Sequence, residues 1–582
     1  MDVIIIHSQK KNIMKKLIQL TAIIVFTAML SSCTDDFASI NQNPEEITEP
    51  SPAHLFTESI YQMANYKGTE WFYDNYNYFY RWNQTTVFVG GNEAQFTEIG
   101  PTGGRYSNTY AFQRNLVEIR RIIDNMDADA QAARTHMRAI TYITPAYQGI
   151  RATDLYGSMP WREAMRGRSE SLFTPVYDSQ QELYEQWLTE LDGAIEVLTG
   201  DDSGQINFGQ QDFIYQGNFM NWARFANSLK LRIALRVENQ DQQWAQQIIN
   251  EVLNSPAGII ESRDDEFVWA PSGEYRHHAQ DFWGAPSAAY NFISKLVELQ
   301  DPRTHFYFDP NDFDQEAVDT FTEQDRAMPD WIDPEVPVDR WDRYRGGPVS
   351  PEFQNTLPWF GSYTDNDGSG YNQLSHINRR LFNPHYDGGS GYWKDALMSA
   401  AEVALYMAEF IEKGYVTGHG TAQEWYERGV RASMETVDDI ARAAQVYDYD
   451  TFQVTDAQID EYLTREDVAL NGSDHLEKIY FQQYINFFRY PTEQFALTRR
   501  TGFPSRTGNI MQWEPPIAGG SELAIPRRFP VSEPDNPINI DNFRSAMEAQ
   551  GWTIGANSGA VLSQERVWWD ANNPAMGTGS FD

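Results

Sequence analysis

The sequence predicts a mainly α-helical fold built from helix–turn–helix repeats. Long segments repeat apolar residues at spacings of three and four, few segments alternate apolar and polar residues, and some helical segments are joined in pairs by short turns. The predicted helices span residues 52–82, 107–126, 129–156, 178–199, 214–237, 242–255, 286–300, 394–414, 421–445 and 474–500.

An export signal precedes these helices. Lys15 and Lys16 are followed by an apolar run over 17–30, which is shorter than the roughly 20 residues needed to cross a bilayer. We therefore interpret residues 1–32 as a secretory signal peptide. The run ends in Leu30-Ser31-Ser32-Cys33, which resembles the bacterial lipobox, so Cys33 is predicted to become the lipidated first residue of the mature protein.

Two alternatives stay open at this end of the chain. Translation can start at Met1 or at Met14, and Cys33 can be an ordinary buried cysteine after a hydrophobic helix. Residues 33–50 are polar and carry no periodic apolar pattern, which is typical of a flexible tether. Residues 51–582 are then expected to form a single domain.

The acidic charge of the chain limits its partners. The 582 residues include 82 acidic and 45 basic side chains, and without residues 1–32 the counts are 81 and 41. Nucleic acid is excluded as a partner, because binding it requires basic groups that neutralise phosphates. A ligand that carries no negative charge is favoured over an anionic one.

The side-chain composition points away from thiol chemistry and toward ring-shaped ligands. Cys33 is the only cysteine, so a lipidated chain offers no disulfide and no zinc–thiolate site, and we predict neither a metal nor a cofactor. Aromatic residues make up 14% of the chain, more than packing usually requires. Aromatic rings also stack on carbohydrates.

The first predicted helix carries a dense aromatic cluster over residues 71–82. Phe72, Tyr76 and Phe79 fall on one helix face, which is the spacing of a packed core stripe. Packing in the core or at a protein interface is therefore the favoured interpretation. A platform on which sugar rings stack is the alternative.

One helix pair is clear from the sequence alone. A helix over 396–413 is expected to stop at Gly414, and a second begins near Ala422 after a short turn that contains glycine. Elsewhere the helices are interrupted by irregular regions at about 303–393 and 502–537. The first contains many aromatic residues, so it is expected to be ordered, and long ordered loops often carry binding sites.

Motifs for catalysis and for metal binding are weak. The sequence holds no zinc-protease motif, no serine-hydrolase elbow and no phosphate-binding glycine loop. The segment Asp365–Gly370 places oxygens at positions 1, 3 and 5 of a possible calcium loop, but His376 stands where a bidentate glutamate closes such a site. A set of Asx-type turns is the favoured interpretation, and a calcium ion bound by Asp365 and Asp367 stays open.

Several segments, in order along most of the chain, resemble one family. They are TDLYGSMPW (153–161), TPVYD (174–178), DFIYQG (212–217), WARFANSLKLR (222–232), DPR (301–303), SAAE (399–402), RRTGFP (499–504), IPRRFP (525–530) and VWWD (567–570). Together they are similar to the SusD/RagB family of nutrient-binding outer-membrane lipoproteins, and more narrowly to its SusD-like branch. The helical spacing of Asn227 and Arg232 suggests structural anchors, and Arg499 and Arg500 are expected to cap a helix end or to pair with carboxylates such as Glu402.

The resemblance implies a function as well as a fold. It implies tetratricopeptide-like helix pairs covered by a loop-rich region, and a protein that is not an enzyme. Such a protein is lipid-anchored and surface-exposed at the outer membrane. It binds a nutrient, here most readily an oligosaccharide, and delivers it to a SusC-like TonB-dependent transporter. A purely structural lid on the transporter and a surface glycan hydrolase are the alternatives.

Four aromatic residues are the candidate ligand contacts. Trp283, Trp359, Tyr363 and Tyr371 lie in or beside the irregular regions, where core packing explains a large ring less well than it does inside a helix. The expected mechanism is stacking of these rings on sugar faces, with polar side chains bound to the hydroxyl groups. Packing of the loops among themselves is the alternative for each ring.

Overall fold

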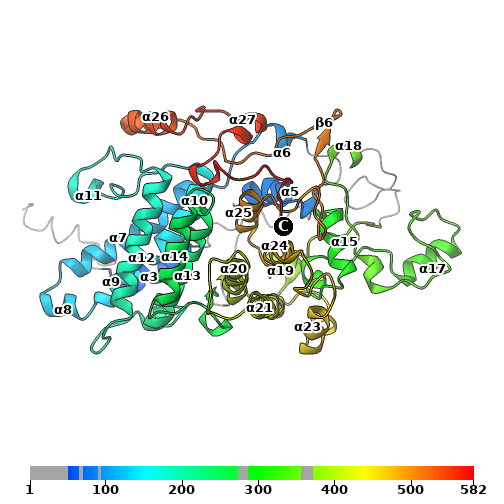
Figure 1. Cartoon of the computed structure of the whole chain (residues 1–582), viewed down its shortest axis with the longest axis horizontal. Coiled ribbons are helices and arrows are strands. Elements are labelled where there is room, and N and C mark those ends of the chain that lie inside the picture. The colour runs from blue at the N-terminus through cyan, green and yellow to red at the C-terminus, as the bar shows by residue number, and fades with distance from the viewer. Residues whose placement is uncertain are drawn as a thin grey trace, which may run out of the picture. The chain divides into compact units, whose positions relative to one another are not determined.

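The structure is a computed structural model that describes residues 50–63, 70–88, 93–271, 273, 286–354 and 371–581. Helices dominate this part of the chain (Figure 1), which confirms the predicted mainly α-helical fold with tetratricopeptide-like helix pairs. The contacts of Pro52–Asp582 form one unit. Among the described residues, no helix is long and apolar enough to cross a membrane. The proposed calcium loop at Asp365–Gly370 lies outside the described residues.

The N-terminal helices pack mainly as sequence neighbours. They are α3 (Pro52–Gln62), α7 (Arg105–Asp124), α8 (Ala128–Ala132), α9 (Thr135–Ile140), α10 (Ile143–Tyr156), α12 (Gln180–Leu198), α13 (Phe219–Val237) and α14 (Gln242–Asn254). Helices α12, α13 and α14 pack in sequence order, as the cyan-to-green block of Figure 1 shows. Local sequence sets where they begin: Ser179 and Glu182 form a capping box at α12, and Asp241 accepts the Trp244 N–H at α14.

The predicted pair in the second half of the chain is α20 (Ala400–Glu412) and α21 (Ala422–Ala444). Gly414 takes a positive φ in the turn between them, as a residue that ends a helix often does. Gly429 on α21 lets the helices approach closely, because a Cβ there would lie 2.7 Å from Leu405 Cγ. The predicted start at residue 396 is wrong, because residues 395–398 form a strand.

Three other predicted helices are interrupted. The segment 474–500 is two helices, α24 (His475–Asn486) and α25 (Pro491–Thr501), because proline is tolerated only in the first turn of a helix. The segment 129–156 divides into α8, α9 and α10. The segment 52–82 contains α3, the π-helix η1 (Trp71–Phe79) and α5 (Tyr80–Trp82).

The π-helical turn changes which rings of the aromatic cluster are buried. Trp71, Phe79 and Trp82 are buried in the core, whereas Phe72 and Tyr76 are only partly buried. The prediction of one α-helical core stripe through Phe72, Tyr76 and Phe79 is therefore wrong in its details. The wider turn of a π-helix rotates successive side chains away from the α-helical register. Core packing remains the main role of the cluster.

Strands are few and short. Strand β1 (Thr86–Val87) pairs antiparallel with β3 (Ser287–Ala288), β2 (Phe267–Trp269) with β4 (Asp395–Met398), and β5 (Ile517–Ala518) with β6 (Ser521–Glu522). The β2–β4 pair joins residues far apart in sequence, with a bulge between Phe267 and Val268.

The described parts of the irregular regions hold only short elements. The short and peripheral helices of the chain are α6 (Ala94–Thr97), α11 (Gly167–Glu170), α15 (Tyr290–Glu298), α16 (Thr304–Tyr307), α17 (Gln315–Glu323), α18 (Pro351–Gln354), α19 (Arg379–Phe382), α22 (Tyr449–Phe452), α23 (Asp456–Leu463), α26 (Ile540–Ala549) and α27 (Gly559–Gln564). Turns of 3₁₀-helix are η2 (Gly209–Gln211), η3 (Arg263–Asp265), η4 (Arg340–Arg343), η5 (Tyr386–Gly388), η6 (Pro537–Asn539) and η7 (Trp568–Asp570).

Buried arginine–carboxylate pairs tie the helices together. Arg232 on α13 holds both oxygens of Glu402 on α20, at 2.5 and 2.7 Å, as expected for an interhelical anchor. The predicted roles of Arg499 and Arg500 are confirmed, since Arg499 caps a carbonyl at the end of α10 and Arg500 pairs with carboxylates, but Glu402 is not their partner. Arg499 donates instead to the backbone carbonyls of Asp154 and Arg527, because Glu402 already faces α13.

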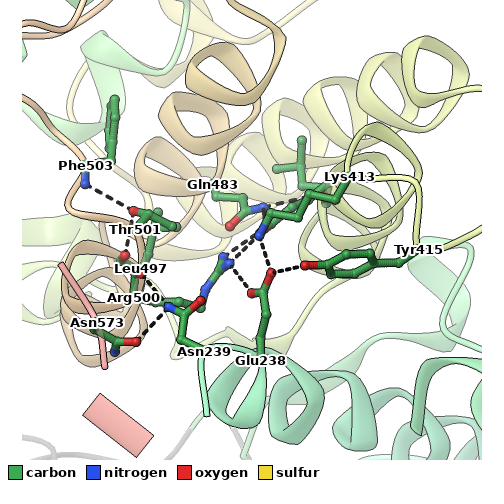
Figure 2. A network of polar contacts seen from close by, with 12 residues as sticks. Glu238, Asn239, Lys413, Tyr415, Gln483, Leu497, Arg500, Thr501, Phe503 and Asn573 are labelled. Atoms are coloured by element: carbon green, nitrogen blue, oxygen red, sulfur yellow. Dashed lines mark hydrogen bonds and ion pairs between the residues drawn. The ribbon is translucent and has the colours of Figure 1, made fainter. Parts of the chain in front are cut away.

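A second buried network joins the ends of four helices (Figure 2). Arg500 on α25 contacts Glu409 on α20, and it lies 3.0 Å from Glu238 at the end of α13. Lys413 bridges the same two carboxylates at 2.5 and 2.7 Å, and Gln483 on α24 donates to Glu409 at 2.8 Å. Burial opposes the ionisation of Glu409, but Arg500 and Lys413 hold its pKa down to about 2.

Candidate functional site

One pocket is lined by residues from five separate parts of the chain. It contains about 830 Å³ of empty space, part of which is open solvent, and η1, α10, α19, β4 and the junction of α24 with α25 form most of its walls. Because no two of these elements follow one another in sequence, only the tertiary fold creates the pocket. We treat it as the candidate ligand site, since concave sites with several convergent polar groups are where small molecules bind.

Aromatic rings form the apolar part of the wall. The rings that line the pocket are those of Trp71, Tyr147, Phe382, Trp393 and Tyr490. Trp71 and Phe382 pack on each other, with ring centroids 5.0 Å apart. Such a wall offers aromatic edges and faces to the apolar side of a ring-shaped ligand.

A carboxylate shared by two arginines lies at one end of the pocket. Glu70 accepts a hydrogen bond from Arg151 at 3.0 Å and lies 3.1 Å from Arg105. Behind this pair, Asp74 contacts Arg105 at 3.3 Å. Burial raises the pKa of Asp74 to about 6, and the nearby Glu70 adds to the increase while Arg105 opposes it. The charges at this end are therefore held in place by one another before any ligand arrives.

A second ion pair lines the pocket from β4 and from the junction of α24 with α25. Arg489 contacts Asp395 at 2.8 Å and donates to the Lys394 carbonyl oxygen at 3.2 Å. Burial lowers the pKa of Arg489. Glu493 also lines the pocket, and although burial opposes its ionisation, Arg236 and Arg232 hold its pKa down to about 2. An ionised Glu493 accepts hydrogen bonds but cannot serve as a general acid at neutral pH.

Asn75 on η1 gives the pocket a side-chain oxygen that can still accept a hydrogen bond. Its Oδ1 is buried and has no hydrogen-bond partner among the described residues. A buried oxygen of this kind costs free energy unless it accepts a hydrogen bond. A ligand hydroxyl group at this point of the pocket would supply that bond.

The sequence did not predict this set of residues. Trp283, Trp359 and Tyr363 lie outside the described residues, as does Cys33. Tyr371 is described, but it lies away from the pocket, where its ring contacts Phe313 and Phe321. The sequence signal that does reach the pocket is the aromatic cluster over 71–82, which contributes Trp71 and also contains Asn75. No sequence signal marked Trp393, Asp395 or Arg489, because their proximity to Trp71 depends on long-range packing.

The helix pairs and the short sheets define the class of protein, an α-helical protein built on tetratricopeptide-like repeats. A family model described as SusD-like, starch-binding and associating with the outer membrane matches residues 44–330 and 359–530. The match covers more than half of the chain, and the chain belongs to this SusD-like family. No curated protein matches the sequence.

Solved structures share the fold. A chitin-binding protein superposes with a TM-score of 0.64 at 21% identity, covering 89% of this chain and 100% of its own. A SusD homologue from Bacteroides fragilis gives 0.64 at 21% identity, over 90% of this chain and 99% of its own. A chitin-binding SusD homologue from Flavobacterium johnsoniae gives 0.59 at 21% identity, over 90% and 98%. At these identities the likeness concerns the fold.

Proposed function

We propose that this protein binds a glycan nutrient at the cell surface and delivers it to a SusC-like TonB-dependent transporter. The observation that carries the proposal is the pocket, where aromatic rings stand beside carboxylates, guanidinium groups and Asn75 within a family described as starch-binding. Aromatic rings bind the apolar faces of sugars, and the polar groups form hydrogen bonds with the sugar hydroxyl groups. Trp283, Trp359 and Tyr363 remain proposed as further contacts.

Binding without turnover fits the chemistry of the pocket better than hydrolysis does. Glycoside hydrolysis requires a carboxylic acid that keeps its proton near neutral pH, paired with a second carboxylate. Glu493 is ionised, and Glu70 is held by Arg151 and Arg105. Asp74, whose pKa burial raises to about 6, is fully buried and does not line the pocket. We therefore propose a binding protein without enzymatic activity, and intact oligosaccharide after long incubation with the purified protein is the expected observation.

Replacing Asn75 with leucine tests the proposed pocket directly. Asn75→Leu removes a buried oxygen that has no partner among the described residues, so the free energy of unfolding should stay unchanged or rise by about 1 kcal/mol. Binding of the cognate oligosaccharide should weaken about tenfold, because its hydroxyl group loses an acceptor. Calorimetric titration with maltohexaose and chitohexaose measures the affinity.

The matched control is Asn254→Leu, at the exposed end of α14. This variant should bind like the wild type. If the wild type bound neither these oligosaccharides nor any other glycan while uptake continued, the alternative of a purely structural lid would be favoured. If Asn75→Leu bound as tightly as the wild type, the site would lie elsewhere.

We further propose that Cys33 carries the lipid that keeps the protein at the outer membrane beside its transporter. The support is the lipobox-like sequence before Cys33 and the outer-membrane association of the family. Cys33→Ser should release the protein from the membrane fraction, since lipid chains supply most of the membrane affinity of such an anchor. Fractionation of cells, with copurification of the transporter as a second readout, measures this. Membrane retention of the variant would contradict the proposal.

A further inference from the structure

A chain of aromatic contacts crosses the loop-rich region, away from the pocket. Phe313 and Phe321 are buried and form its base. The ring of Tyr371 lies 5.7 Å from Phe313 and 5.0 Å from Phe321, and the indole of Trp331 lies 5.9 Å from Phe313. Tyr371 and Trp331 are half-buried, so part of each ring reaches the surface.

The backbone holds these rings in position. The Asn372 N–H donates to the Asp312 carboxylate at 2.7 Å, and the Asp312 N–H donates to the Asn372 carbonyl at 2.9 Å. The Arg345 and Ser375 backbones are joined in the same way, at 2.8 Å. These bonds hold the segment after Tyr371 against the segments that carry Phe313 and Arg345.

An arginine stands at each end of the ring chain. The Arg326 guanidinium lies 3.8 Å from the centroid of Phe321, and the Arg345 guanidinium lies 4.2 Å from that of Trp331. A guanidinium that stacks on a ring still presents its N–H groups at its edge, in the fork that matches a carboxylate or a sulfate. The rings therefore orient both cations without using their hydrogen-bonding capacity.

In the part of the chain that the structure describes, neither arginine has an anionic partner. Within the described ranges, no carboxylate lies within ion-pair distance of Arg326 or Arg345, and neither side chain donates a hydrogen bond. Burial lowers the pKa of Arg345, and the charges of Tyr290 and Asp342 only partly counteract this decrease. Arg500, by contrast, contacts two buried carboxylates.

We propose that this surface, made of Arg326, Phe321, Tyr371, Trp331 and Arg345, binds an anionic glycan through its carboxylate or sulfate groups. The two guanidinium groups would each take an anionic substituent, and the exposed parts of Tyr371 and Trp331 would stack on the sugar rings between them. This inference rests on the proposed glycan binding and specifies its ligand class. It reverses the expectation of a neutral ligand that the total charge suggested.

Local and total charge act over different distances here. The negative charge of the whole protein repels an anion at long range, but salt screens that field within about 10 Å. Once an anionic glycan touches the surface, short contacts with guanidinium groups dominate. Because salt screens this long-range repulsion, binding should persist at physiological salt, and it should depend on the two arginines individually.

Calorimetric titration with four oligosaccharides tests the proposal. Hexagalacturonate carries carboxylates, its methyl ester carries none, a chondroitin sulfate hexasaccharide carries sulfates as well, and chitohexaose is neutral. An acidic glycan should bind at least about tenfold more tightly than the methyl ester, and Arg326→Gln/Arg345→Gln should remove that difference. Comparison of hexagalacturonate with the chondroitin sulfate hexasaccharide shows whether carboxylate or sulfate groups are preferred.

The control removes the same charge elsewhere. Arg168 and Arg442 are 78% and 61% exposed, so Arg168→Gln/Arg442→Gln should leave the preference for an acidic glycan intact.

If Arg326→Gln/Arg345→Gln failed to fold, each single variant would be expected to lose about threefold or more in affinity for the acidic glycan. Equal affinity for the acid and its ester, or full affinity in Arg326→Gln/Arg345→Gln, would overturn the inference. Tight binding of chitohexaose alone would overturn it while leaving the proposed function standing, whereas binding of no glycan would reject both.

Discussion

Replacing Arg500 with methionine is expected to lower the free energy of unfolding by about 3–5 kcal/mol. Arg500 is 4% exposed and contacts two buried carboxylates, Glu409 and Glu238. Methionine fills much of the same volume but leaves both carboxylates to Lys413, which cannot neutralise two negative charges. Chemical denaturation of wild type and variant at neutral pH measures the difference. A loss below about 1 kcal/mol would mean that the network contributes little.

The dependence of this loss on pH follows from Glu409. Its pKa in the folded protein is lowered to about 2 from an ordinary value of 4.5, so its contribution to stability is complete above pH 4.5 and is lost as the pH falls toward 2. The difference between wild type and Arg500→Met should therefore shrink over that interval. Arg442→Gln is the control, because Arg442 is 61% exposed and its pair with Asp439 should contribute little at any pH.

Replacing Arg489 with methionine is expected to cost about 3 kcal/mol or more and to abolish ligand binding in the pocket. Arg489 and Asp395 are both buried, and their ion pair at 2.8 Å lines the pocket. Without the guanidinium, the Asp395 carboxylate stays in a buried site and loses its cation. Denaturation measures the stability, and calorimetric titration measures the affinity for the oligosaccharide.

A double variant separates the two effects. Asp395→Asn/Arg489→Met removes both charges, so most of the lost stability should return, since an isolated buried charge costs more than no charge at all. Ligand binding should not return, because the pocket still lacks the guanidinium group of Arg489. Recovery of binding together with stability would show that Arg489 supports the fold only. Failure of the double variant to regain stability would contradict the buried ion pair as the cause.

The positions of the helices could be predicted where local chemistry sets them. The pair α20 and α21 could be predicted from apolar periodicity and from Gly414 between them. The order of the family motifs predicts the same helical scaffold. Prediction was wrong where a local signal competed with periodicity. Pro491 breaks a segment that is otherwise continuous, and residues 395–398 leave the helical pattern because β2 supplies a strand partner.

The sequence by itself determined the class of fold and the family, because both are written in contiguous residues with a fixed period or order. Only the tertiary structure decided which residues meet. It placed Asn75, Asp395 and Arg489 around one pocket, and it left Arg326 and Arg345 beside aromatic rings with no carboxylate of the described residues in reach. The physical reason is that ion pairs and pocket walls depend on distances of a few ångströms between segments that are hundreds of residues apart, and no local pattern encodes those distances.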